Sequence, residues 1–370
     1  MSISDYYLLI NHVFHDQPKR MVEILNLFPD VNAFKAKADT YARETQMSDR
    51  QKKILTETLS HFSADTVREK LEKRGLSVIT WDSDDYPELL REIPDPPPVL
   101  YLQGRKSLLS RECFAVVGSR DITAYGQEVT NRLVQDISPY FVVVSGLAAG
   151  VDTIAHDTAV RLGYPTIAVV ATGLDRVYPT ENKALAEKII SNGLIISEYP
   201  LGTPAIGYRF PQRNRIISGL SRGMLICEAK QQSGAMITAR HAMEQNRDVF
   251  AVPGPIFSRQ SDGCHALIQD GAKLVRGIED ILGEYSFLPF PKTKRVPLAS
   301  VTPIQITPSL SGVDAEVWDL LDNDPQQLED LLAKSPLSIS QILPILSHFE
   351  AQQWITVLPG QYYVRHRGGQ

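Results

Sequence analysis

The feature that most constrains the fold is a regular alternation of short apolar segments with amphipathic segments. Phe114–Val117 is apolar throughout and ends at a glycine, which is typical of a strand buried on both faces. Val129, Leu133 and Ile137 then recur at intervals of four, as on one face of a helix. Further apolar strands are expected at 141–144, 166–170, 194–196, 225–227 and 248–252. This alternation predicts a doubly wound, mostly parallel α/β sheet.

The regions on either side of this alternation differ from it. Residues 1–75 place short apolar groups among charges without strand-like alternation, so a small helical N-terminal domain is expected. Residues 76–287 hold the α/β domain, which begins with a proline-rich connector. Prolines also mark residues 288–311 as a linker. Residues 312–370 contain three short amphipathic segments and two strand-like ones, which is the outline of a winged helix.

Composition excludes several classes of protein. The net charge is −5 and the pI is near 5.9, so nucleic acid would need a local basic patch. The cysteines Cys113, Cys227 and Cys264 form no CxxC pair, which argues against a disulfide framework and a structural zinc site. The first residues lack a signal segment, and no stretch has the roughly 18 apolar residues of a membrane span. A cytoplasmic location is expected.

Four predicted strand ends carry glycine and small polar residues. They are 118–120, 145–150, 172–175 and 228–234. In a doubly wound sheet the ligand lies beyond these ends, where glycine lets the backbone approach it and helix-start amides favour an anion. The simpler alternative is that the glycines only make tight turns. Because all four segments share one rim, which includes Arg120, a phosphate-bearing ligand is the preferred interpretation.

An arginine-rich run lies just before the strand at 225–227. Arg213 and Arg215 are interleaved with Phe210 and Asn214, and guanidinium groups with an aromatic ring suit single-stranded nucleic acid. Arg209 and Arg222 are expected to be solvated or paired with acids. Lys183 and Lys230 are weaker candidates for the site.

Motifs for catalysis and cofactors are not supported. The fingerprint GxGxxG is absent, and 202–207 has P-loop glycine spacing without the following Lys-Ser/Thr. Ser221 lies in a GxSxG match that precedes a strand, whereas a nucleophile elbow follows one. His156 is expected to be a structural hydrogen-bonding residue, and Cys264-His265 is too isolated for a metal site. We therefore expect neither a cofactor nor a metal.

The C-terminal segment is acidic. In residues 311–370 acids outnumber bases, and the third predicted helix has no Lys or Arg as far as Trp354. A helix that reads DNA normally presents donors to phosphates and base edges. Protein interaction or regulation is therefore preferred over groove reading for this segment.

Several segments together carry a family resemblance. They are DSDDYPELLREIPDPPPVLYLQG (82–104), VVGSR (116–120), SGLAAGVDTIAH (145–156), GLDRVYP (173–179), SEYPLGTPAIGYRFPQRNRIISGLS (197–221), EAKQQSGAMITARHAMEQNRDVFAVPG (228–254) and LIQDGA (267–272). The chain resembles the DprA family, also called Smf, of bacterial DNA-processing proteins. The resemblance covers nearly all of residues 80–285. The winged-helix end is similar more loosely, and the N-terminal part is a degenerate form of the family's SAM-like or helix-hairpin-helix start.

The resemblance implies a homodimer, built on an extended Rossmann-like domain, that is not an enzyme. Such proteins bind single-stranded DNA, shield incoming strands and load the RecA recombinase during natural transformation. Residues matching the family, to which DNA contact is assigned, are Gly118, Ser119, Arg120, Ser145, Gly146, Phe210, Arg213, Asn214, Arg215, Ser233, Gly234 and Thr238. Cys264-His265 departs from the family's usual Gly-Ser/Thr-Asn, near the implied dimer contact.

Two other functions stay open. Nucleoside-monophosphate phosphoribohydrolases of the lysine-decarboxylase-like group share this kind of sheet and phosphate rim. Their PGGxGTxxE signature is missing, and Ser233–Thr238 occupies the comparable turn. The second alternative is a protein-interaction scaffold with a vestigial rim, against which the intact Arg120, Arg213 and Arg215 argue.

Overall fold

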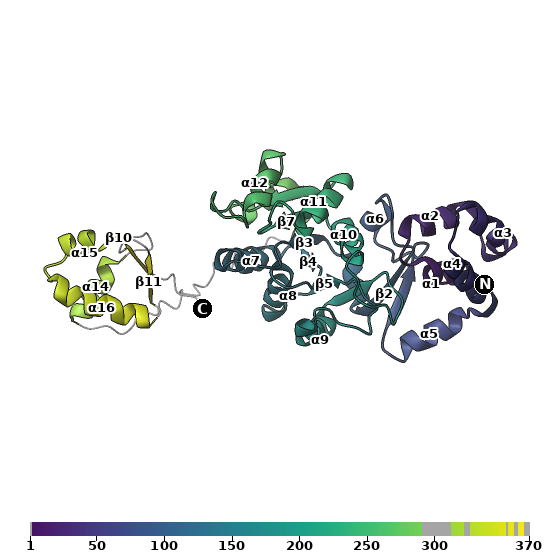
Figure 1. The fold of residues 1–370 in the computed structure, drawn as a ribbon, viewed down its shortest axis with the longest axis horizontal. Coiled ribbons are helices and arrows are strands. Elements are labelled where there is room, and N and C mark those ends of the chain that lie inside the picture. The colour runs from purple at the N-terminus through teal and green to yellow at the C-terminus, as the bar shows by residue number, and fades with distance from the viewer. Residues whose placement is uncertain (1, 291–311, 322–325, 353, 359–361, 366–370) are drawn as a thin grey trace. The chain divides into compact units, whose positions relative to one another are not determined.

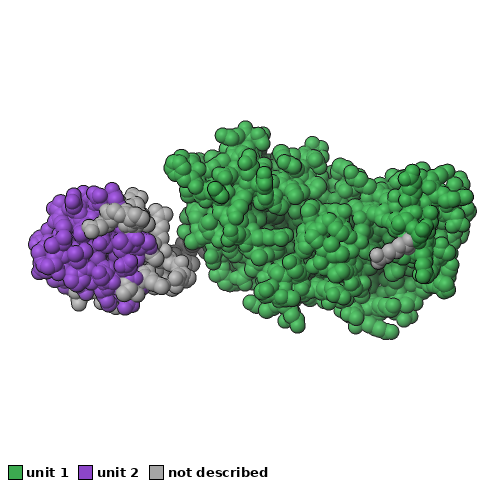
Figure 2. Space-filling view, viewed as in Figure 1, with its two compact units in different colours: residues 1–291 green, residues 292–370 purple. Residues whose placement is uncertain are grey.

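The computed structural model describes residues 2–290, 312–321, 326–352, 354–358 and 362–365. The chain divides into two compact units, residues 1–291 and 292–370 (Figure 2). Most of the predicted linker, from residue 291 to residue 311, lies outside the described residues.

The first unit is built on a nine-stranded sheet with the order β1-β2-β6-β5-β4-β3-β7-β8-β9 (Figure 1). The strands are β1 (Ser77–Thr80), β2 (Val99–Gly104), β3 (Cys113–Val117), β4 (Val142–Ser145), β5 (Thr166–Val169), β6 (Leu194–Ser197), β7 (Gly223–Ile226), β8 (Asp248–Ala251) and β9 (Lys273–Leu274). Pairing is parallel from β6 across to β9. The prediction of a doubly wound, mostly parallel sheet is confirmed.

One edge of this sheet was not expected. β1 pairs antiparallel with β2, and β2 pairs antiparallel with β6. The segment between them, expected to be extended, also contains the short helix α6 (Glu88–Arg91). Antiparallel pairing needs no crossover helix. The alternation of strands with helices therefore gave no sign of this edge.

Helices cover both faces of the sheet. They are α7 (Ala124–Ile137), α8 (Val151–Arg161), α9 (Lys183–Asn192), α10 (Arg209–Gly219), α11 (Gly234–Glu244), α12 (Asp262–Gln269) and α13 (Ile278–Leu282). Alternate residues of β3 point to opposite faces: Phe114 and Val116 pack with α7 and α8, whereas Ala115 and Val117 pack on the side of α10 and α11. The central strands are thus buried on both faces, as their continuous apolar sequence requires.

The N-terminal helices form a cluster beside β1 and β2. They are α1 (Ile3–Phe14), α2 (Pro18–Leu27), α3 (Val31–Glu44), α4 (Asp49–His61) and α5 (Ala64–Glu72). Ser2 and Ser48 begin α1 and α4 with capping boxes. The cluster has its own core, and Leu8 of α1 also packs with Val99 of β2. The predicted helical character of this region is confirmed.

The second unit combines three helices with a small sheet. The helices are α14 (Val313–Leu320), α15 (Leu328–Lys334) and α16 (Ile339–Ala351), and the strands are β10 (Gln326–Gln327), β11 (Ile355–Leu358) and β12 (Tyr362–Arg365). The strands pair antiparallel in the order β10-β12-β11. This is the predicted winged-helix arrangement; the expected turn at Pro359-Gly360 lies outside the described residues.

Candidate functional site

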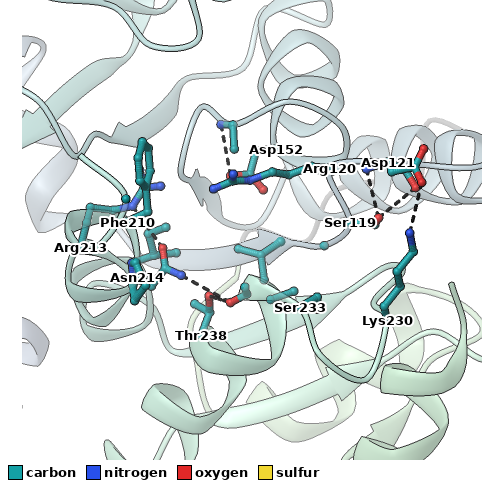
Figure 3. Close-up of a pocket in the computed structure, with 18 of the residues that line it drawn as sticks. Ser119, Arg120, Asp121, Asp152, Phe210, Arg213, Asn214, Lys230, Ser233 and Thr238 are labelled. Carbon is teal, nitrogen blue, oxygen red and sulfur yellow. Dashed lines mark hydrogen bonds and ion pairs between the residues drawn. The ribbon is translucent and has the colours of Figure 1, made fainter. Parts of the chain in front are cut away.

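An open pocket of about 600 Å³ lies beyond the carboxyl ends of the parallel strands (Figure 3). From β3 the chain adds β4, β5 and β6 on one side and β7, β8 and β9 on the other, so the direction of winding changes at β3. Ligands of doubly wound sheets bind at such a point. Turns after β3, β4 and β7 and the start of α10 supply most of the pocket wall.

Most residues assigned to the site from the sequence line this pocket. They are Gly118, Ser119, Arg120, Phe210, Arg213, Asn214, Ser233, Gly234 and Thr238. Ser145, Gly146 and Arg215 are not among the lining residues. The site thus draws together segments that are more than a hundred residues apart in the chain.

Arg120 and Phe210 face one another across the pocket. The Arg120 guanidinium lies 5.4 Å from the centre of the Phe210 ring, within the range of a cation–π contact. Phe210 also packs against Tyr178, with 5.4 Å between ring centres. Arg120 is exposed and forms no ion pair with any other described residue. Its charge is therefore available to a ligand, beside an aromatic surface.

Arg213 lies beneath the pocket rather than on its rim. Its side chain is buried, and its Nη1 donates to the carbonyl oxygens of Gly146, at 2.7 Å, and Val169. Burial lowers the pKa of Arg213 to about 10, although the nearby Asp152 opposes this change. The guanidinium therefore remains protonated at neutral pH and places a fixed positive charge under the pocket.

Ser145 and Gly146 support the pocket from below. The Ser145 hydroxyl is buried and donates to the Val116 carbonyl at 2.7 Å. The Gly146 amide donates to the Asp152 carboxylate at 3.1 Å. A Cβ atom at Gly146 would lie only 2.7 Å from the Arg213 guanidinium, so a larger residue here would displace the Arg213 and Asp152 side chains. Gly146 thus contacts both Arg213 and Asp152, and the predicted DNA contacts of Ser145 and Gly146 stay predictions.

Arg215 makes internal ion pairs. It is 1% exposed, and its Nη1 and Nη2 donate to the two carboxylate oxygens of Glu198 at 2.8 and 2.7 Å. Its Nε lies 3.2 Å from the Asp95 carboxylate. Nothing in this position supports the predicted DNA contact, and we leave Arg215 out of the proposed binding surface.

Arg209 and Arg222 are paired with acids, as the sequence suggested. Arg209 contacts Asp16 at 2.6 Å, and Arg222 contacts Glu112 at 2.7 Å. Lys183 does not line the pocket, whereas Lys230 does.

Two helices present their first turns to the site. α11 begins after Ser233, and α8 begins after Gly150 with its first amide, that of Val151, donating to the Ser119 carbonyl at 3.1 Å; neither helix has a side-chain cap bond. Uncapped amides at a helix start favour an anion. The buried Ser233 hydroxyl has no hydrogen-bond partner among the described residues, and the Asn214 amide donates to the Gly234 carbonyl at 3.5 Å. The pocket therefore offers donors for phosphate beside an aromatic ring for a base.

The lining residues that the sequence analysis missed include Asp121, Asp152 and Tyr178. Asp152, just inside α8, is buried, and this burial raises the pKa of its carboxyl group. Asp121 lies on the rim, with its carboxylate 3.3 Å from the Lys230 ammonium (Figure 3). Tyr178 supports Phe210. Asp121 directly follows the glycine turn 118–120, and Asp152 lies two residues after the turn 145–150, so proximity to these turns was the available signal.

Other reactive side chains have structural surroundings. Burial raises the pKa of Cys113, Cys227 and Cys264 to about 12, so none is a ready thiolate. His156 is buried, with Nδ1 2.8 Å from the Thr166 hydroxyl, as expected for a structural residue. The described residues contain no cluster of potential metal ligands. Within the same residues, no helix combines the length and hydropathy that crossing a bilayer requires.

Two family models match this chain. Residues 77–286 match the family described as DNA recombination-mediator protein A, and residues 302–361 match the DprA winged helix domain. DNA processing protein DprA of Streptococcus pneumoniae is 48% identical over 55% of this chain and 72% of its own length.

Two solved structures share the fold. A crystal structure of DprA from Streptococcus pneumoniae matches with a TM-score of 0.65 and 36% identity, over 77% of this chain and 99% of that one. A structure of DNA processing protein A from Helicobacter pylori, which concerns the single-stranded DNA binding mode of that protein, matches with a TM-score of 0.52 and 32% identity. That match covers 57% of this chain and 96% of the other. The chain belongs to the DNA recombination-mediator protein A family, the family of DprA and Smf.

Proposed function

We propose that this protein binds single-stranded DNA in the pocket, protects incoming strands and loads RecA onto them in natural transformation. The observation that carries the proposal is the pairing of exposed Arg120 with Phe210 at 5.4 Å, beside the uncapped start of α11. A groove that grips single strands combines positive charge with aromatic rings on which bases stack. The Helicobacter pylori relative's single-stranded DNA binding mode supports the same assignment.

In this proposal the pocket makes two kinds of contact with the DNA strand, one with its phosphates and one with a base. Arg120, Lys230 and the first amides of α11 hold phosphates, while Phe210 stacks on a base. Buried Arg213 adds positive potential from below. These contacts read no base edges, so little sequence preference is expected.

The wider role rests on family membership. We propose a cytoplasmic homodimer that hands its strand to RecA and has no catalytic activity of its own. We also propose the four-part division into residues 1–75, 76–287, 288–311 and 312–370, with the acidic C-terminal domain serving protein interaction. The contacts for RecA and for the second subunit are left unassigned.

The phosphoribohydrolase alternative is not favoured by the comparisons. Its PGGxGTxxE signature is absent from the sequence. Ser221, which lies in the nucleophile-elbow motif match, is buried and donates its hydroxyl hydrogen to the Ile217 carbonyl at 2.9 Å. It does not line the pocket.

A titration of labelled oligo-dT against a duplex of the same length tests the proposal. Fluorescence anisotropy at several salt concentrations should show that the single strand binds at least about tenfold more tightly, because only unpaired bases reach Phe210. The logarithm of the affinity should fall linearly with the logarithm of the salt concentration. Equal binding of both forms, or release of ribose phosphate from a nucleotide, would reject the proposal.

Removing the rim carboxylate should strengthen binding. Asp121 is 83% exposed at its side chain and attracts the Lys230 ammonium at 3.3 Å. Asp121→Asn frees this lysine for phosphate and removes repulsion of the DNA, so affinity at low salt should rise about threefold to tenfold. Anisotropy titration measures the change, which should shrink as salt is raised.

A matched variant separates this local effect from net charge. Asp65→Asn alters an aspartate that is 91% exposed, in the N-terminal helices, and changes the charge of the chain equally. It should leave affinity nearly constant. If both variants increased affinity to the same degree, the rim carboxylate would have no special role.

A further inference from the structure

An ion pair connects the start of α10 to the N-terminal helices. Arg209 is the first residue of α10, and Asp16 lies two residues beyond the end of α1. The Arg209 Nε donates to one carboxylate oxygen of Asp16 at 2.6 Å, and Nη2 donates to the other at 2.8 Å. Its Nη1 donates to the Pro204 carbonyl at 2.6 Å. All three guanidinium nitrogens are therefore engaged, in the bidentate form that fixes orientation best.

The arginine of this ion pair is buried, while the Asp16 side chain is 33% exposed. Arg209 is 4% exposed, and its guanidinium also lies 5.3 Å from the centre of the Tyr199 ring. The hydrogen bonds to Asp16 raise the pKa of Arg209. Burial alone would raise the pKa of Asp16, but the hydrogen bonds and charge of Arg209, together with His15 and Tyr208, lower it on balance. Both partners are thus charged near neutral pH.

A second contact joins α1 to the same helix. The Asn11 amide donates to the Glu198 carbonyl at 3.0 Å, and its oxygen accepts from the Tyr101 hydroxyl at 2.9 Å. The carboxylate of Glu198 holds Arg215 within α10. α10 is therefore tied to the N-terminal cluster directly at its first residue and indirectly near its middle.

We propose that Asp16 is a positioning residue for the pocket: it fixes the first turn of α10 and so aims the Phe210 ring at the bound strand. Phe210 directly follows Arg209. The position of its ring determines the contact with the Arg120 guanidinium, which lies 5.4 Å from the ring centre. Arg209 is not among the pocket-lining residues, so Asp16 acts through helix placement rather than through contact with DNA. This inference rests on the proposed function.

The experiment compares Asp16→Asn with the native full-length chain. Oligo-dT carrying one 2-aminopurine base reports both affinity and base stacking by its fluorescence. The variant keeps the size of the side chain but loses its charge, so affinity should fall about tenfold, a value within the range of one lost stacking contact. The quenching of 2-aminopurine should weaken, whereas the salt slope should stay constant because no phosphate contact is removed.

Other variants separate positioning from general damage. Asp16→Glu should restore most of the affinity, and Asp49→Asn, at an exposed aspartate of α4, should bind like the native chain. In a Phe210→Ala background, Asp16→Asn should add little, because the ring it positions is gone. If Asp16→Asn does not fold, Arg209→Lys replaces it, since lysine keeps the charge but loses the fork.

The outcomes are distinct. Native-like affinity of folded Asp16→Asn, or an equal loss of affinity with and without Phe210, would overturn the positioning role. A native chain that did not bind oligo-dT would instead remove the proposed function, and the inference with it.

Discussion

Arg120→Ala is expected to weaken the binding of single-stranded DNA at low salt by at least about tenfold. Two contributions are lost together. Arg120 is exposed and free to pair with phosphate, and it also lies over the Phe210 ring, 5.4 Å from its centre. Loss of one phosphate contact should reduce the salt slope by about one. Anisotropy titrations of oligo-dT at several salt concentrations measure both quantities.

Two further variants make this test specific. Arg120→Lys keeps the charge but loses the planar group that stacks on the ring, so it should recover the salt slope and only part of the affinity. Arg161→Ala removes an exposed arginine at the far end of α8, about 15 Å along the helix from its first residue. It should leave the slope unchanged. If Arg120→Ala and Arg161→Ala behaved alike, the strand would not lie in this pocket.

The second large effect concerns stability. Arg215→Met is expected to lower the free energy of unfolding by about 3–5 kcal/mol, because it leaves a buried carboxylate without its partner. Glu198 is only 1% exposed and receives both terminal nitrogens of Arg215. Equilibrium unfolding in urea, followed by circular dichroism, measures the loss.

Two comparisons identify the cause. Arg222→Met breaks an ion pair with Glu112 whose side chains are 35% and 37% exposed, so it should cost no more than about 1 kcal/mol. The double variant Arg215→Met and Glu198→Met removes both buried charges and should recover part of the stability. Equal losses for Arg215→Met and Arg222→Met would show that burial of the first pair has no energetic consequence.

The central sheet was predictable because its strands are buried on both faces. Phe114–Val117 must be apolar at every position, and that pattern is visible without tertiary information. The edge formed by β1 and β2 was missed although Val99–Leu102 is fully buried. The prolines that precede β2 indicate an extended connector. In addition, β2 pairs antiparallel with its neighbours, and such pairing needs no crossover helix that the sequence pattern could have shown.

The arginines show where sequence reasoning about the site fell short. From the sequence, Arg213 and Arg215 are assigned the same role, although both lie on one helix, α10. Side chains two positions apart on a helix point about 200° apart, so both cannot enter one pocket. The sequence pattern predicts no helix here, although Pro211 in its first turn is compatible with one, because amides of a first turn lack partners. The acids that bind Arg209 and Arg215 are distant in sequence, and only the fold brings them near.

The pair of Asp16 and Arg209 also has a consequence for how the molecule is made. Its partners are separated by 193 positions in the chain. During synthesis the N-terminal helices leave the ribosome first and can assemble their own core, since domains fold largely in order of emergence. Asp16 cannot form its ion pair until Arg209, at the start of α10, has been translated, which happens after strands β1 to β6. A nascent chain that ends before residue 209 therefore contains Asp16 but not α10, and it cannot yet form the pocket.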